Sequence, residues 1–215
     1  MNLYNQDCLP AMKEMPDNEF SLAIVDPPYG LGMDGGKRQY NKYVRKSWDR
    51  EIPSEEYFNE LRRVSDNQII WGGNYFPLPP SRGWVVWDKT IHGNTFADGE
   101  LAWTSYDRNL RIFPLNICFI GHNRIHPTQK PVPLYKWLLK NYAKPGQTIL
   151  DTHLGSGSIA IACHDYGYDL TAYEIDKEYF EAATGRIERH KAQGQLFQAG
   201  EVMTVENMEK ERAMP

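Results

Sequence analysis

The feature that most restricts the fold is an alternation of strand-like and helix-like segments in the last third of the chain. Thr148–Asp151 has the pattern of a short buried strand, a glycine-containing turn follows, and residues 159–166 have the pattern of a helix. A second strand at 170–174 and a helix from Lys177 to about His190 come next. This succession is typical of a parallel sheet covered by helices, so we expect an α/β fold.

The rest of the chain continues the alternation, with helices expected at 54–64 and 133–142 and strands at 21–26, 68–71, 84–87, 100–103 and 111–113. Residues 21–26 form an apolar run that ends at an acid and two prolines. This is the pattern of a buried strand whose carboxyl end carries a loop, where chemistry is expected. A length of 215 residues and 41% hydrophobic content suit one domain with one sizeable core.

Composition excludes several classes of protein. No run reaches the roughly 18 apolar residues of a membrane helix, and the first residues lack the basic and apolar regions of a signal peptide. We therefore expect a cytoplasmic protein with no membrane partner. Cys8, Cys118 and Cys163 are too widely spaced for a Cys-x-x-Cys site or a disulfide framework, so neither a metal site nor a disulfide is expected.

Basic residues gather in the segment 31–50. The net charge of −4 argues against a histone-like protein, but this segment holds six basic residues and two acids, together with three aromatic rings. Cations mixed with flat rings are typical of nucleic-acid contacts, although a solvated loop has the same composition. The candidate DNA-binding residues are Lys37, Arg38, Lys42, Arg45 and Lys46.

One motif lies in the turn from Asp151 to Ser158, between a strand and a helix. Gly155 and Gly157 let the backbone approach a ligand, and the helix that follows offers free N–H groups. Glu174 ends the next strand, where a carboxylate can accept hydrogen bonds from a ribose. The pattern indicates a nucleoside-containing cofactor, and tight packing of the turn is the alternative. The turn matches neither a dinucleotide fingerprint nor a P-loop.

A second motif is Asp26-Pro27-Pro28-Tyr29. The exocyclic amine of a base is a poor nucleophile because its lone pair is delocalised into the ring. A carboxylate at Asp26 and the carbonyl of Pro27 could accept its two hydrogens and stabilise the charge that grows during transfer. The prolines fix these acceptors in place, and Tyr29 offers a face for an extruded base. A rigid turn at a strand end is the alternative interpretation.

These motifs together resemble the amino-group DNA methyltransferases, which methylate adenine N6 or cytosine N4. Asp26-Pro27-Pro28-Tyr29 looks like their catalytic tetrapeptide, and Asp151-x-x-x-Gly155-Ser156-Gly157 looks like their cofactor loop. The segment 126–131, His-Pro-Thr-Gln-Lys-Pro, resembles the one that precedes this loop. The catalytic motif comes first, as in the beta ordering of the family, and the resemblance covers approximately residues 3–189.

The resemblance implies a Rossmann-like class I methyltransferase fold, a mostly parallel twisted sheet with circularly permuted motif order, and S-adenosylmethionine as cofactor. Asp7 and the backbone of Cys8 would hold the adenine of the cofactor, and Glu174 its ribose. The turn Gly155-Ser156-Gly157 would hold the methionine end, with Lys130 near the same pocket. The family loop usually reads Asp-Pro-Phe, so His153 in Asp151-Thr152-His153 replaces an aromatic residue that would pack on the cofactor.

We expect residues 1–191 to form one catalytic domain. It would contain a DNA-contact loop at 31–50 and a small target-recognition insertion at 88–125, and residues 192–215 would form a flexible tail. Double-stranded DNA is the expected partner. The short recognition region suggests short target sites or help from a second subunit, that is, a homodimer. A bacterial, phage or plasmid origin is expected, with either a restriction–modification or an orphan role, and the sequence identifies no restriction endonuclease as partner.

The leading interpretation is site-specific methylation of adenine N6 in DNA after base flipping, because Asp at the first motif position favours adenine in this family. Cytosine N4 methylation on the same scaffold is the nearest alternative. A catalytically silent DNA-binding or regulatory protein and a methyltransferase acting on RNA or protein are the others.

Overall fold

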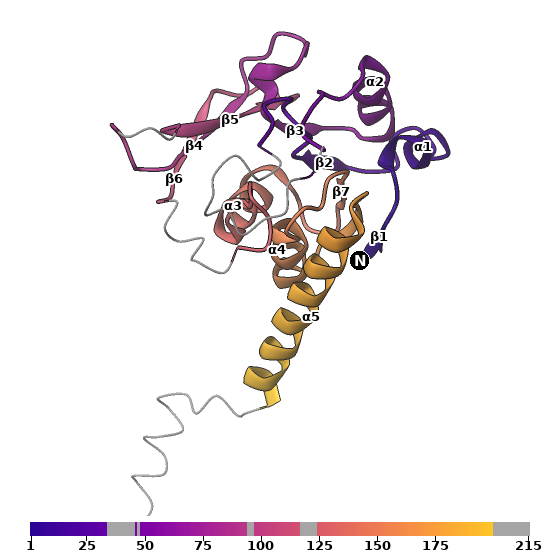
Figure 1. Ribbon diagram of the computed structural model, residues 1–215, viewed down its shortest axis with the longest axis vertical. Coiled ribbons are helices and arrows are strands. Elements are labelled where there is room, and N and C mark those ends of the chain that lie inside the picture. The colour runs from indigo at the N-terminus through magenta and orange to yellow at the C-terminus, as the bar shows by residue number, and fades with distance from the viewer. Residues whose placement is uncertain (34–45, 47, 94–96, 117–123, 200–215) are drawn as a thin grey trace, which may run out of the picture.

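The computed structural model describes residues 1–33, 46, 48–93, 97–116 and 124–199. Eight strands form one sheet in the order β1-β8-β7-β2-β3-β5-β4-β6 (Figure 1). Their bounds are β1 Asn2–Tyr4, β2 Leu22–Val25, β3 Gln68–Trp71, β4 Trp84–Asp88, β5 Gly99–Thr104, β6 Arg111–Pro114, β7 Thr148–Asp151 and β8 Asp169–Tyr173. Among the strands of the described residues, only β5 runs antiparallel to its neighbours, so the expected mostly parallel α/β sheet is confirmed.

Helices cover both faces of the sheet (Figure 1). They are α1 Cys8–Lys13, α2 Glu55–Val64, α3 Val132–Tyr142, α4 Ser158–Tyr166 and α5 Lys177–Ala199, with a 3₁₀ turn η1 at Gly73–Tyr75. Ile24 and Ile69 belong to the core that contains residues of α3, α4 and α5. Ala23 and Ile70, one position along, belong to the core with α1 and α2. Because successive strand residues face opposite sides, all four residues of β2 and the last three of β3 are apolar.

Strands from the first part of the chain pair with strands from the last part. β1 pairs with β8 through Leu3 and Ala172, and β2 pairs with β7 through Ala23 and Leu150. These pairings are parallel, so the carboxyl ends of β2, β7 and β8 lie at the same edge. The permuted order expected from the sequence is thereby confirmed, and both motifs emerge at that edge.

Helix α2 shows how local sequence sets these elements. Ser54 accepts a hydrogen bond from the backbone N–H of Tyr57 at 3.3 Å, and Glu55 and Glu56 occupy the first turn. Both features stabilise a helix start, as predicted. The buried side of α2 comprises Tyr57, Phe58, Leu61 and Val64.

Two elements differ from expectation. Helix α1 was not predicted, because six residues including Pro10 give too little periodicity; Asp7 caps it by accepting from the N–H of Leu9. Helix α5 continues to Ala199, past the expected end near His190 and into the segment 192–215 expected to be flexible. Residues 200–215 lie outside the described part of the chain.

No helix among the described residues combines the length and apolar character needed to cross a membrane.

Leu138 tests the packing of α3 on the sheet, since its side chain is fully buried. We expect Leu138→Ala to lower the free energy of unfolding by about 2–5 kcal/mol, because it leaves a cavity between the helix and the strands. Urea denaturation measures the change. Lys140→Ala, at an exposed position of the same helix, is the control and should change stability by less than about 0.5 kcal/mol.

Candidate active site

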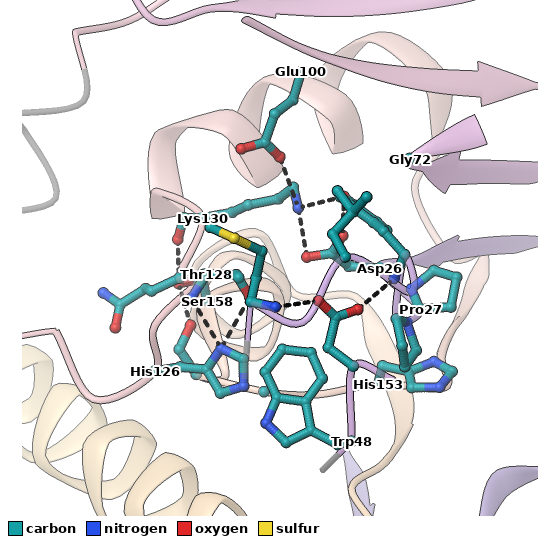
Figure 2. A pocket seen from close by; sticks show the side chains of 18 of the residues that line it. Asp26, Pro27, Trp48, Gly72, Glu100, His126, Thr128, Lys130, His153 and Ser158 are labelled. Atoms are coloured by element: carbon teal, nitrogen blue, oxygen red, sulfur yellow. Dashed lines mark hydrogen bonds and ion pairs between the residues drawn. The ribbon is translucent and has the colours of Figure 1, made fainter. Parts of the chain in front are cut away.

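A cavity of about 590 Å³ lies where the carboxyl ends of the parallel strands meet. Residues of the Asp26–Tyr29 motif line it together with His153, Gly155, Ser156 and Glu174. Figure 2 shows Asp26 next to Lys130 and Glu100 on the opposite side of Lys130, with His126 and Trp48 on another side of the pocket. The two sequence motifs therefore share one cavity, although more than a hundred residues separate them.

The Asp26 carboxylate is held on both oxygens. Lys130 Nζ donates to Oδ2 at 2.5 Å, and the Tyr29 hydroxyl donates to Oδ1 at 2.6 Å. Burial raises the pKa of Asp26, and the charge of Lys130 only partly opposes the effect. Each carboxylate oxygen keeps a second lone pair, so Asp26 can still accept from a ligand.

Lys130 is almost completely buried, with 3% of its surface exposed. Besides Asp26, its ammonium lies 3.1 Å from Glu100 Oε2 and 3.2 Å from the Tyr29 hydroxyl. Burial would lower the pKa of Lys130, but Asp26 and Glu100 together outweigh burial and raise it. The backbone carbonyl of Lys130 accepts from Ser158 Oγ at 2.7 Å. Lys130 thus connects the Asp26–Tyr29 loop to the start of α4.

Asp49 fixes the backbone after the two prolines. It is 2% exposed, and its Oδ1 accepts from the N–H groups of Tyr29 and Gly30 at 2.8 and 2.9 Å. Its Oδ2 accepts from the N–H of Met33 at 2.6 Å. One carboxylate therefore organises three donors of the loop that carries Tyr29.

Tyr29 is packed tightly at its ring. Tyr75 stacks on it with ring centroids 5.3 Å apart and planes 22° apart. Gly72 has φ +69°, and a Cβ built there would lie 2.2 Å from the Tyr29 ring, so only glycine fits. Tyr75 is 44% exposed and lines the cavity, whereas Phe76 is buried in the core.

The glycine turn is tied to the end of β8. Glu174 Oε2 accepts from the N–H of Gly155 at 2.8 Å, and Oε1 accepts from the N–H of Asp176 at 2.9 Å. The Glu174 carboxylate, expected to meet a ribose, thus already has two backbone partners here. Gly155 and Gly157 have positive φ values of 51° and 72°, in keeping with the need for glycine.

Four of the expected cofactor residues are not among the described residues that line the cavity: Asp7, Cys8, Asp151 and Gly157. The Asp7 side chain caps α1, and Cys8 is buried in the core beside α2. Burial raises the pKa of the Cys8 thiol to about 12.

Asp151 and His153 lie between the cavity and the core. Asp151 is 3% exposed and accepts from the N–H of His153 at 3.0 Å; burial raises the pKa of Asp151 to about 8. His153 pairs with Thr152 Oγ1 at 2.9 Å, and Tyr57 reaches the same hydroxyl at 2.6 Å. Burial lowers the pKa of His153 to about 4, so its ring is neutral near pH 7.

Of the five basic candidates, only Lys46 lies in the described part of the chain. Its ammonium is 2.6 Å from Asp176 and 2.8 Å from Glu178, and lies 4.5 Å from the centre of the Tyr179 ring. The charge expected to meet a phosphate is therefore paired with two carboxylates here. Lys37, Arg38, Lys42 and Arg45 lie outside the described residues.

Three rings form an aromatic wall of the cavity beside Lys46: Trp48, His126 and Tyr179. The His126 ring lies 5.1 Å from Trp48 and 4.4 Å from Tyr179, and His126 Nδ1 is 3.1 Å from the Thr128 hydroxyl. Burial, assisted by the charge of Lys130, lowers the pKa of His126 to about 4.

Three charged residues among those described at this site were missed from the sequence: Asp49, Lys89 and Glu100. Lys89 directly follows β4, so the rule that placed Asp26 after β2 could have found it. Glu100 lies at the start of the antiparallel β5, which brings an amino end to this edge. No local pattern marks Asp49. Within the described residues, no three His, Cys, Asp or Glu side chains are grouped to hold a metal ion.

Known proteins resemble this chain over most of its length. A family model described as DNA methylase matches residues 84–185. The type II methyltransferase M.HpaI of Haemophilus parainfluenzae is 26% identical over 230 aligned residues, covering 85% of this chain and 72% of the relative.

Solved structures share the fold. M1.HpyAVI in its SAM complex has a TM-score of 0.58 at 19% identity, with 86% of this chain and 98% of that one covered. The cytosine-N4-specific PvuII DNA methyltransferase also gives 0.58, at 13% identity and with 88% and 89% covered.

Asp49→Asn tests whether the three hydrogen bonds to Asp49 hold the loop that carries Tyr29. An amide offers one acceptor atom in place of two and turns N–H groups toward donors. We expect hydrogen exchange at the amides of Tyr29, Gly30 and Met33 to accelerate by about tenfold or more. Asp17→Asn, which removes only an exposed partner of Arg63, is the control. Unchanged protection in Asp49→Asn would show that the three bonds do not hold the loop.

His126 tests the cost of burying a neutral imidazole. Its pKa in the folded protein, about 4, lies below the ordinary 6.5. The unfolded chain therefore binds a proton more readily, and stability is lost as pH falls from 6.5 toward 4. We expect His126→Phe to lose less stability than the unsubstituted protein over this interval, as measured by urea denaturation at several pH values. Equal slopes would contradict the assignment.

Proposed function

We propose that the chain is a DNA methylase of the kind that modifies the amino groups of bases, as its likeness to such proteins supports, and that it transfers a methyl group from S-adenosylmethionine to adenine N6 in double-stranded DNA. The observation that carries the proposal is the single cavity shared by the Asp26–Tyr29 loop and the glycine turn. The choice of adenine rests on Asp at the first position of the catalytic motif. Residues 1–191 form the catalytic unit in this proposal.

The electrostatics of the cavity suit a cofactor with positive charge. Burial raises the pKa of Asp26, of Asp151 to about 8, and of Glu174, so these carboxyl groups have too little compensating charge around them. A cation bound nearby would favour their ionised forms. The sulfonium of S-adenosylmethionine supplies both that charge and the methyl group when the cofactor is bound. The turn from Gly155 to Gly157 would hold its methionine end.

The residues around Asp26 prepare the target amine. The free lone pairs of the Asp26 carboxylate and the carbonyl oxygen of Pro27 would accept its two N–H hydrogens and concentrate the nitrogen lone pair. Transfer would replace the sulfur–carbon bond of the cofactor by a nitrogen–carbon bond, and the methylated amine would release one proton to solvent. The stacked rings of Tyr29 and Tyr75 offer a flat wall for a base swung out of the duplex.

DNA contacts are assigned to two regions. Lys37, Arg38, Lys42 and Arg45 would meet phosphates, and residues 88–125 would read the target sequence. Lys46 is left out of the phosphate contacts because Asp176 and Glu178 hold its ammonium.

The decisive experiment is transfer of a labelled methyl group from S-adenosylmethionine to unmethylated genomic DNA, followed by nucleoside digestion and mass spectrometry. N6-methyladenine is the expected product. N4-methylcytosine would keep the site and mechanism and change the base. DNA binding without a labelled nucleoside would favour a silent DNA-binding protein, and label in RNA or protein would move the activity to those substrates.

Asp26→Asn should reduce the turnover number by about a hundredfold or more, because an amide is a weaker acceptor at the point where positive charge develops. Affinity for S-adenosylmethionine, measured by calorimetry, should change only a few-fold. Asp66→Asn, at an exposed site just before β3, is the matched control with full activity. Full turnover in Asp26→Asn would remove this residue from the mechanism.

A further inference from the structure

Four charged side chains of alternating sign form a row from the catalytic loop across the cavity. We define this charge row as Asp26, Lys130, Glu100 and Lys89. Lys130 bridges Asp26 at 2.5 Å and Glu100 at 3.1 Å, and Lys89 reaches Glu100 at 2.8 Å. Figure 2 shows Lys130 between the two carboxylates. Asp26 follows β2, Lys89 follows β4, Glu100 lies at the start of β5 and Lys130 lies just before α3.

Burial makes this arrangement costly to the fold. The side chains of Lys130 and Lys89 are only 2% and 11% exposed. Removing charges from water costs more than their pairing returns in many proteins, and apolar groups of similar size often stabilise more. The row is therefore poorly explained by stability alone, and its end at Asp26 suggests a role in chemistry.

Lys130 by itself would hinder the reaction. A lone ammonium on Asp26 withdraws negative charge from the carboxylate that must accept the target N–H. It also repels the positive charge that develops on the amine during transfer. Glu100 opposes both effects, because it shares the ammonium and adds a second negative charge. The three ammonium hydrogens then have three acceptors: Asp26, Glu100 and the Tyr29 hydroxyl.

We propose that Glu100 is a positioning residue for methyl transfer, acting through Lys130 to keep the Asp26 carboxylate available to the target amine. Lys89 limits this effect by sharing Glu100 from the other side. The inference rests on the proposed function, since it assigns Asp26 to the reacting amine.

The row predicts opposite responses to two substitutions. Glu100 raises the pKa of Asp26, whose pKa burial also raises and Lys130 lowers. Glu100→Gln should therefore move the titration of Asp26 to lower pH, and Lys89→Gln should move it to higher pH because Glu100 then acts without its second partner. The other groups that face Asp26 stay in place in both variants: Tyr29 on its own loop, Tyr57 on α2, Tyr135 on α3 and Asp151 at the end of β7.

The experiment combines carboxyl ¹³C NMR titration of Asp26 with turnover measured from pH 5 to 9. In Glu100→Gln we expect the turnover number to fall by about tenfold, with the KM for S-adenosylmethionine within about twofold, and its acid limb to move down by about half a pH unit or more. Lys89→Gln should move the acid limb up, and Glu100→Asp should restore part of the turnover. Glu56→Gln, which breaks an exposed pair with Lys13, is the control that changes neither readout.

Damage to folding would shift both variants in the same direction and lower thermal stability. Shifts in the same direction, or unchanged titration and turnover in Glu100→Gln, would overturn the proposal. Because the NMR titration needs no turnover, it tests the coupling of Glu100 to Asp26 independently of the proposed methyl transfer. If the Asp26 titration shifts in opposite directions in the two variants but the protein methylates no base, the proposed function is wrong and the electrostatic coupling within the charge row still holds.

Discussion

The parallel pairing of β2 with β7 is the contact on which the whole site depends. Ala23 opposite Leu150 fixes the register of the two strands, and the residues that follow them are the Asp26 loop and the glycine turn. Backbone hydrogen bonds, rather than the loops, therefore set how far apart the two motifs lie. β8 extends the same edge and supplies Glu174, which holds the turn from its other side.

Within that frame, burial and nearby cations have opposite effects on three carboxyl groups at or beside the cavity. Burial dominates at Asp26 and Asp151, whose pKa values are raised, whereas ion pairing dominates at Glu100, whose pKa is lowered by Lys130 and Lys89 against the effect of burial. The balance leaves Asp26, Asp151 and Glu174 short of positive charge and Glu100 well supplied. A cationic cofactor therefore fits between the glycine turn and the Asp26 end of the charge row.

The sequence predicted much of the fold because its signals are local. Helix α2 carries its cap at Ser54 and its apolar face within eleven residues, and the strands show buried runs or short apolar segments. The contacts of Asp49, and the ion pair between Lys130 and Glu100, join residues distant in the chain, so no local pattern reports them. The pairing of Lys46 was missed for the same reason: composition marks it as a cation, but only the fold brings Asp176 beside it.

Lys46 also joins two segments around the cavity. Its ion pairs attach the chain just before Trp48 to the start of α5, and Trp48 packs on His126 at the wall of the cavity. These pairs are partly exposed and are therefore weakened by salt. Salt would then weaken two separate interactions of such a protein: its attraction to a polyanion, and the Lys46 ion pairs beside the Trp48 wall of the cavity. A salt titration of overall activity would combine these two effects. Only a titration performed at saturating cofactor would report how many DNA phosphates the protein neutralises.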